Sequence, residues 1–96
     1  MASSREVYRA LRRLDYEPWL GPSEADQPEG QETRWNVTIR GERVCVEEDE
    51  SAPGLWYTYV YWASGDYTDF PGRRSTAAIM RYVDQAHAAV IEDQDG

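Results

Sequence analysis

The residue types that carry out catalysis are present in this chain, but their spacing matches no reaction that the sequence can name. Cys45 is the only cysteine and His87 the only histidine. A disulfide within the chain, or a metal site built from several such side chains, is therefore ruled out. Serine, histidine and aspartate all occur, yet no G-x-S-x-G turn positions a serine as a nucleophile. The sequence predicts a protein that is not an enzyme, with no catalytic residues, no cofactor and no bound metal.

Carboxylates are the most abundant reactive groups, and they occur in blocks. The 96 residues include 18 acidic and 10 basic side chains, a formal net charge of −8. One block is Glu47-Glu48-Asp49-Glu50, another is segment 15–32 with its six acidic residues, and a third lies in the last thirteen residues. Because phosphate backbones are bound by Lys and Arg, this charge predicts no direct nucleic-acid binding. Acidic blocks serve either solubility or a charged protein partner.

An aromatic segment between Leu55 and Ala63 is the second feature that suggests binding. Its tryptophans alternate with Tyr57, Tyr59 and Tyr61, which we call the tyrosine row. Exposed tryptophan is a larger hydrophobic liability than half-exposed tyrosine, so we expect the tryptophans to face the core and the tyrosines to face outward. Tyrosine is enriched at protein interfaces. The alternative is that the row only stabilises the sheet through cross-strand pairs.

Periodicity indicates the elements that must position these groups. Residues 3–14 show helical spacing, with Ser3 or Ser4 as the cap and Val7, Leu11 and Leu14 as an apolar stripe. Arginines 5, 9, 12 and 13 fall on another face, which we expect to be solvated and paired with the acidic remainder. Residues 15–32 form an acidic Pro/Gly loop, of which the first part should dock on the core and 23–32 should stay mobile.

Residues 33–70 change to a period of two and predict an antiparallel sheet. Gly41-Glu42 is predicted to form a type II′ turn between the first two strands. Segments 55–63 and 67–70 are predicted to form the third and fourth strands. Residues 75–91 return to helical spacing, with Ser75 or Thr76 as the cap. The tail 92–96 is expected to fray.

The predicted fold is therefore α+β, one domain over residues 1–96. Its order is α-β-β-β-β-α, an antiparallel meander with the N- and C-terminal helices packed on one face and the other face left uncovered. No apolar run approaches the ~20 residues that span a bilayer, so a cytoplasmic protein is expected. The order resembles the outline of the double-stranded RNA-binding domain. The basic run of that family would fall near residues 72–81, where this chain has only Arg73, Arg74 and Arg81, so no function is inferred from it.

These features favour a small, acidic binding protein that docks on a basic, nucleic-acid-binding protein and blocks it as a mimic of nucleic acid. In size, acidity and aromatic surface the chain is similar to immunity proteins against nuclease toxins and to phage-encoded inhibitors of host defence nucleases. The predicted partner-binding residues are Arg40, Glu47, Glu48, Asp49, Glu50, Tyr57, Tyr59, Tyr61, Asp66 and Asp69. The alternatives are a homodimer that buries its open sheet face, and an acidic surface adapted to a salt-rich cytoplasm.

Overall fold

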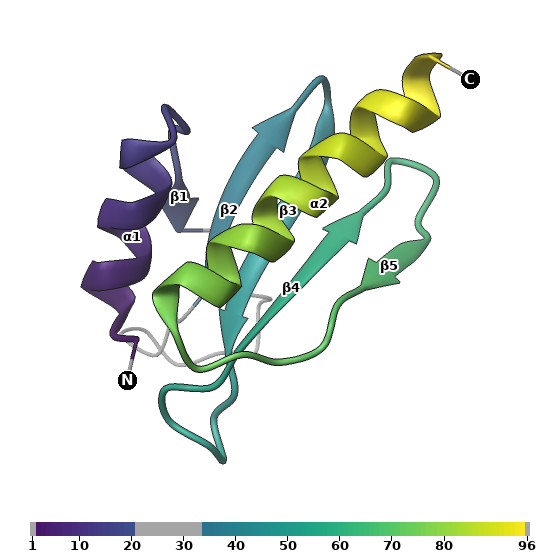
Figure 1. The fold of residues 1–96 in the computed structure, drawn as a ribbon. Coiled ribbons are helices and arrows are strands. Elements are labelled where there is room, and N and C mark those ends of the chain that lie inside the picture. The colour runs from purple at the N-terminus through teal and green to yellow at the C-terminus, as the bar shows by residue number, and fades with distance from the viewer. Residues whose placement is uncertain (1, 21–33, 96) are drawn as a thin grey trace.

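A computed structural model describes residues 2–20 and 34–95 and confirms the α+β fold (Figure 1). The mobile segment predicted for residues 23–32 lies outside the described residues. The elements are α1 (Ser4–Arg13), β1 (Trp19–Leu20), β2 (Arg34–Ile39), β3 (Glu42–Glu48), β4 (Trp56–Tyr61), β5 (Tyr67–Asp69) and α2 (Thr76–Asp95). The strands form one antiparallel sheet in the order β1-β2-β3-β4-β5. The two-residue strand β1 is an addition to the predicted order, because two residues are too few to show a period.

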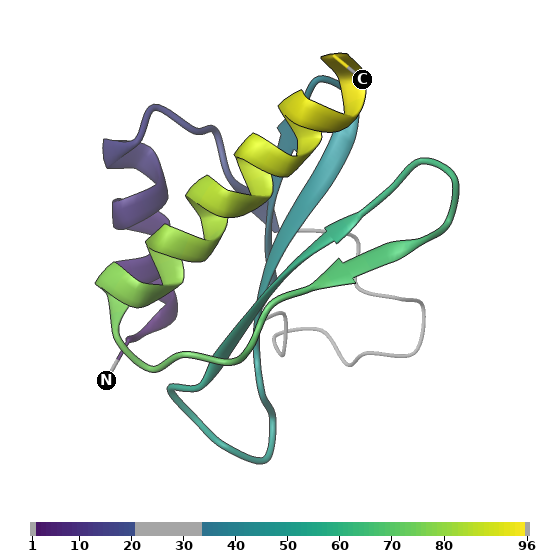
Figure 2. The same cartoon turned by 45° about the vertical axis from the view of Figure 1, so that its right-hand side comes forward.

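Both helices lie on one face of the sheet, as Figures 1 and 2 show, with α2 crossing β3 and β4 and α1 beside α2. Alternate strand residues such as Val44 and Val60 point into this layer and are fully buried. Trp56 is buried with them, and its Nε1 donates to the carbonyl oxygen of Ala2 at 2.9 Å. The tryptophan side of β4 therefore faces the core, as predicted.

Ser3 is the cap of helix α1 and forms a capping box with Glu6, in which each side chain accepts a hydrogen bond from the other residue's backbone N–H. Val7 and Leu11 are buried, but Leu14 follows the helix and is exposed, so the predicted stripe ends one turn early. Among the described residues the only ion pair joins β2 to β3. The α1 arginines are exposed, as expected, and none of them pairs with a carboxylate of the described residues.

The turn between β2 and β3 also differs from the prediction. Ile39 pairs with Glu42, so the two central residues are Arg40 and Gly41, with φ of +48° and +86°. Positive φ at both positions is typical of type I′, the turn whose twist suits a hairpin. Gly41 is therefore the second central residue, and the type II′ assignment was wrong by one position.

Helix α2 extends to Asp95, four residues beyond the predicted end at residue 91. The Ser75 hydroxyl accepts a hydrogen bond from the Ala78 N–H, which identifies the cap. Near the other end, Gln94 Nε2 donates to the Arg40 carbonyl oxygen at 2.8 Å and fastens the helix to the β2–β3 turn. None of the described helices is both long and apolar enough to cross a bilayer.

Candidate functional site

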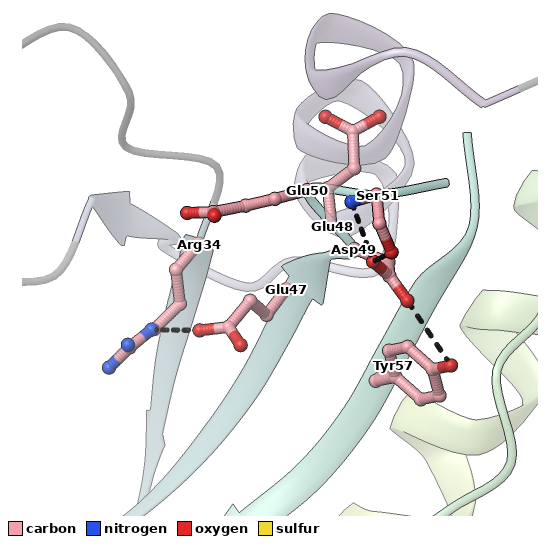
Figure 3. A pocket seen from close by; sticks show the side chains of 7 residues that line it. All are labelled: Arg34, Glu47, Glu48, Asp49, Glu50, Ser51 and Tyr57. Carbon is pink, nitrogen blue, oxygen red and sulfur yellow. Dashed lines mark hydrogen bonds and ion pairs between the residues drawn. The ribbon is translucent and has the colours of Figure 1, made fainter. Parts of the chain in front are cut away.

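The predicted acidic block forms one end of the sheet, where β3 ends and β4 begins. Figure 3 shows its side chains around a pocket of about 430 Å³. The lining residues are Arg34, Glu47, Glu48, Asp49, Glu50, Ser51 and Tyr57, and we call this set the acidic end. The structure therefore brings Tyr57 of the tyrosine row together with the whole carboxylate block. Arg34 and Ser51 are additions that the sequence did not indicate.

Three of the four carboxylates accept hydrogen bonds from neighbouring residues, and Figure 3 draws those of Glu47 and Asp49. Glu47 Oε1 accepts from Arg34 Nε at 2.7 Å across the β2–β3 pair, and Glu48 Oε2 accepts from the Gly54 N–H at 2.8 Å. Asp49 Oδ1 accepts from both the hydroxyl and the N–H of Ser51, at 2.7 and 2.8 Å. These Ser51 bonds lower the pKa of Asp49 below its usual value. The acceptors are thus ordered before any partner arrives.

The remaining carboxylate, Glu50, is exposed and makes no hydrogen bond or ion pair with the described residues. Tyr57, another lining residue, is 40% exposed, and its hydroxyl lies 3.5 Å from Asp49 Oδ2. Gly72 sits behind the Tyr57 ring, where a Cβ would be only 2.9 Å from Cε1. The pocket lining therefore includes one unpaired carboxylate, Glu50, and one supported aromatic ring, Tyr57.

The other tyrosines of the row are less accessible than expected. Tyr59 and Tyr61 point to the same outer face but are only partly exposed, and burial raises the pKa of Tyr59. Arg43 lies between two rings on this face, 5.5 Å from the centre of Trp19 and 5.6 Å from that of Tyr61. The outer face is thus already packed with its own side chains.

Tyr67, which the prediction did not include, is the most exposed aromatic residue of this face, at 57%. Its ring contacts Tyr61 at 4.8 Å and Tyr59 at 5.9 Å between centroids. The pairing of Tyr67 with Tyr61 follows from a β4–β5 hairpin. The predicted fourth strand, residues 67–70, already contained Tyr67, so its pairing with β4 could have indicated that Tyr67 joins the tyrosine row.

The centre of the outer face is buried, which corrects the expectation of an uncovered sheet surface. Asn36 and Cys45 are adjacent on β2 and β3, and their exposed fractions are 0% and 1%. The strand register places them between the larger side chains of Trp19 and Tyr59. Asn36 and Cys45 therefore add almost no accessible surface to the outer face.

The remaining predicted residues lie away from the acidic end. Arg40 is in the β2–β3 turn, Asp66 precedes β5, and Asp69 pairs with Tyr59. The β2–β3 turn and the acidic end flank opposite ends of β3, whose seven residues span roughly 20 Å. The predicted partner-binding residues therefore lie on two separate surfaces instead of one.

The only histidine has a structural contact in this fold. The Tyr16 hydroxyl and His87 Nδ1 are 2.8 Å apart and join the segment after α1 to α2. Burial, followed by the charge of Asp84, raises the pKa of Tyr16. His87 therefore helps to position the chain that leads into β1.

Comparison with protein-family models, with curated proteins and with solved structures finds no match to this chain.

Proposed function

We propose that this chain is a non-enzymatic binding protein that docks on a basic, nucleic-acid-binding protein and blocks it. Docking would use the acidic end, with the ordered carboxylates standing in for phosphates. The observation that carries the proposal is that the side chains of Glu47, Glu48 and Asp49 are already held beside the exposed Tyr57 ring. Side chains that are ordered beforehand lose less entropy on binding.

Charge supports the same choice of partner. The lining of the acidic end has four carboxylates and one guanidinium. The whole chain has a formal net charge of −8, so its field attracts a basic surface and repels nucleic acid. An inhibitor of this type combines rapid electrostatic association with an aromatic anchor that slows dissociation.

The test is capture of proteins from extracts of the source cells on the immobilised full chain, with Glu50→Lys as the comparison. Glu17→Lys, an exposed site outside the acidic end, is the matched control for charge. We expect a basic protein that binds the wild type and the control, and binds E50K roughly three- to tenfold more weakly. The free chain should displace nucleic acid from that protein.

The proposal is wrong if no captured protein distinguishes E50K from the control. It is equally wrong if the protein that does so can bind nucleic acid and the chain at the same time.

Self-association through the outer face is a second candidate, and charge balance favours it. Arg34 and Arg43 offset Glu47 and Asp69 on this face, so two copies would meet without local repulsion. Sedimentation equilibrium of the wild type and of Tyr57→Lys distinguishes the cases. A dimer that Y57K dissociates supports this candidate, whereas a monomer at high concentration rejects it.

A further inference from the structure

A second groove in this molecule combines aromatic and acidic residues but has no basic residue in its lining. It has a volume of about 610 Å³, within the roughly 300–1,000 Å³ of ligand pockets. It lies between the C-terminal part of α2 and the hairpin of β4 and β5, and we call it the hairpin groove. The residues that matter for its chemistry are Glu42, Trp62, Asp66, Tyr67, Thr68 and Asp93.

Hydrogen bonds hold both walls of the hairpin groove. On the hairpin side, Trp62 Nε1 donates to Thr68 Oγ1 at 2.8 Å, and Glu42 Oε2 accepts from the Ala63 N–H at 2.7 Å. On the helix side, the bond from Gln94 to the Arg40 carbonyl fixes the turn that carries Asp93. The groove is therefore formed before a ligand enters.

The end of α2 gives an independent reason to expect a cation. A helix has a partial negative charge at its C-terminus, which basic side chains normally offset. The last turn of this 20-residue helix has no basic residue, and Glu92 and Asp93 add negative charge there. The helix end and these two carboxylates therefore favour binding of a cation nearby.

The shape of the site favours an organic cation over a metal ion. Within residues 2–20 and 34–95, no three acidic, histidine or cysteine side chains are arranged to hold a metal. Elsewhere the chain places guanidinium groups on rings, with Arg43 5.5 Å from Trp19 and Arg73 5.1 Å from Tyr82. The aromatic lining of the hairpin groove offers the same kind of contact to a cation from outside.

We propose that the hairpin groove binds an arginine side chain of a partner protein. The carboxylates of Glu42, Asp66 and Asp93 would surround the guanidinium, and the aromatic lining would pack against its plane. Arginine suits the site better than lysine because a planar guanidinium stacks on rings and bonds to several carboxylate oxygens. This site is separate from the acidic end and does not depend on the function proposed for it.

The probe is Nα-acetyl-arginine amide, with its citrulline counterpart as a neutral molecule of the same shape. Titration of the full chain is followed by two-dimensional ¹H–¹⁵N NMR. We expect saturable shifts of the Trp62 indole N–H and of the Thr68 and Asp93 amides, with a millimolar dissociation constant. Citrulline should produce no saturable shift. Equal binding of citrulline, or arginine shifts confined to residues 47–50, would overturn the proposal.

Two variants of α2 make the same change of charge inside and outside the groove. Asp93→Lys should weaken arginine binding at least about fivefold and raise the thermal midpoint of the free protein, because a lysine there offsets the helix dipole. Asp84→Lys, at an exposed position nearer the middle of α2, should bind within about twofold of wild type. Glu50→Lys should also bind normally, which separates this site from the acidic end. If D84K weakens binding as much as D93K, the inference fails.

Discussion

The Cys45 thiol donates a hydrogen bond to the Asn36 amide oxygen across the β2–β3 pair, with an S–O distance of 3.2 Å. Both side chains are buried on the sheet face that lies away from the helices. A buried hydrogen-bonded pair fixes the register of two strands, because a slip of one residue would leave both groups unsatisfied. Because the Cys45 thiol is buried, the stability of the protein should depend on pH in the alkaline range.

Stability should fall as the pH rises above about 9. Burial raises the pKa of Cys45 above 9.0, and burial also raises those of Tyr16 and Tyr59 above 10.0. The unfolded chain therefore releases these protons first, so the stability is fully present below pH 9 and is lost as the pH climbs toward the folded values. Urea denaturation between pH 7 and 11 measures this loss. Cys45→Ala should reduce the loss of stability that begins near pH 9. An unchanged loss in this variant would contradict the assignment of that step to Cys45.

Replacement of different carboxylates in the acidic end should have different effects on stability and on association. Asp49→Lys removes the acceptor that orders Ser51, so the thermal midpoint should fall. Glu50→Lys breaks no contact with the described residues and should leave the midpoint nearly unchanged. Once a partner is known, E50K should slow association and make it less sensitive to salt. Stopped-flow measurements at several salt concentrations check this, and an unaltered association rate would count against steering by Glu50.

Gly72 should support the position of the Tyr57 ring. Gly72→Ala places a methyl group 2.9 Å from Tyr57 Cε1 and 3.0 Å from Leu55 Cδ1, so the ring must move outward. Gly41→Ala is the matched control, because its φ of +86° is strained for alanine while nothing lies within 4 Å. Both variants should lose about 1 kcal/mol of stability. Only G72A should shift the Tyr57 ring signals in NMR spectra.

Trp56 should account for a large part of the core. Trp56→Phe removes buried ring volume and leaves the Ala2 carbonyl without its indole donor, so we expect a loss of about 2–4 kcal/mol in the free energy of unfolding. Trp19→Phe is the comparison, since Trp19 is 36% exposed and should cost under about 1 kcal/mol. Chemical denaturation gives both values. Similar losses at the two positions would mean that Trp56 does not anchor the N-terminus.

The sequence predicted the elements whose patterns are long and periodic. Alternation placed the Trp56 side of β4 inward, and helical spacing located α2. The turn at Arg40 was missed because glycine suits either central position of a hairpin turn. Strand β1 was missed because it is defined by pairing with β2, a tertiary contact that two residues cannot encode locally.

The candidate site was predicted only in part, for a similar reason. The carboxylates of residues 47–50 are adjacent in the sequence, so their clustering could be foreseen. The pairing of Glu47 with Arg34 depends on strand register, and the burial of Asn36 depends on neighbours from other strands. The hairpin groove unites Asp93 with Glu42, which are far apart in the sequence and meet only through the packing of α2.

The two edges of the sheet limit how this protein can meet other chains. The outermost strands, β1 and β5, have two and three residues, whereas the strands between them have six or seven. Such short edges present few backbone groups on which a foreign strand could extend the sheet. Growth into fibrils by edge-to-edge addition is therefore disfavoured, even in a chain so rich in aromatic strand residues. Recognition has to proceed through side chains, whose identity can change without altering the fold.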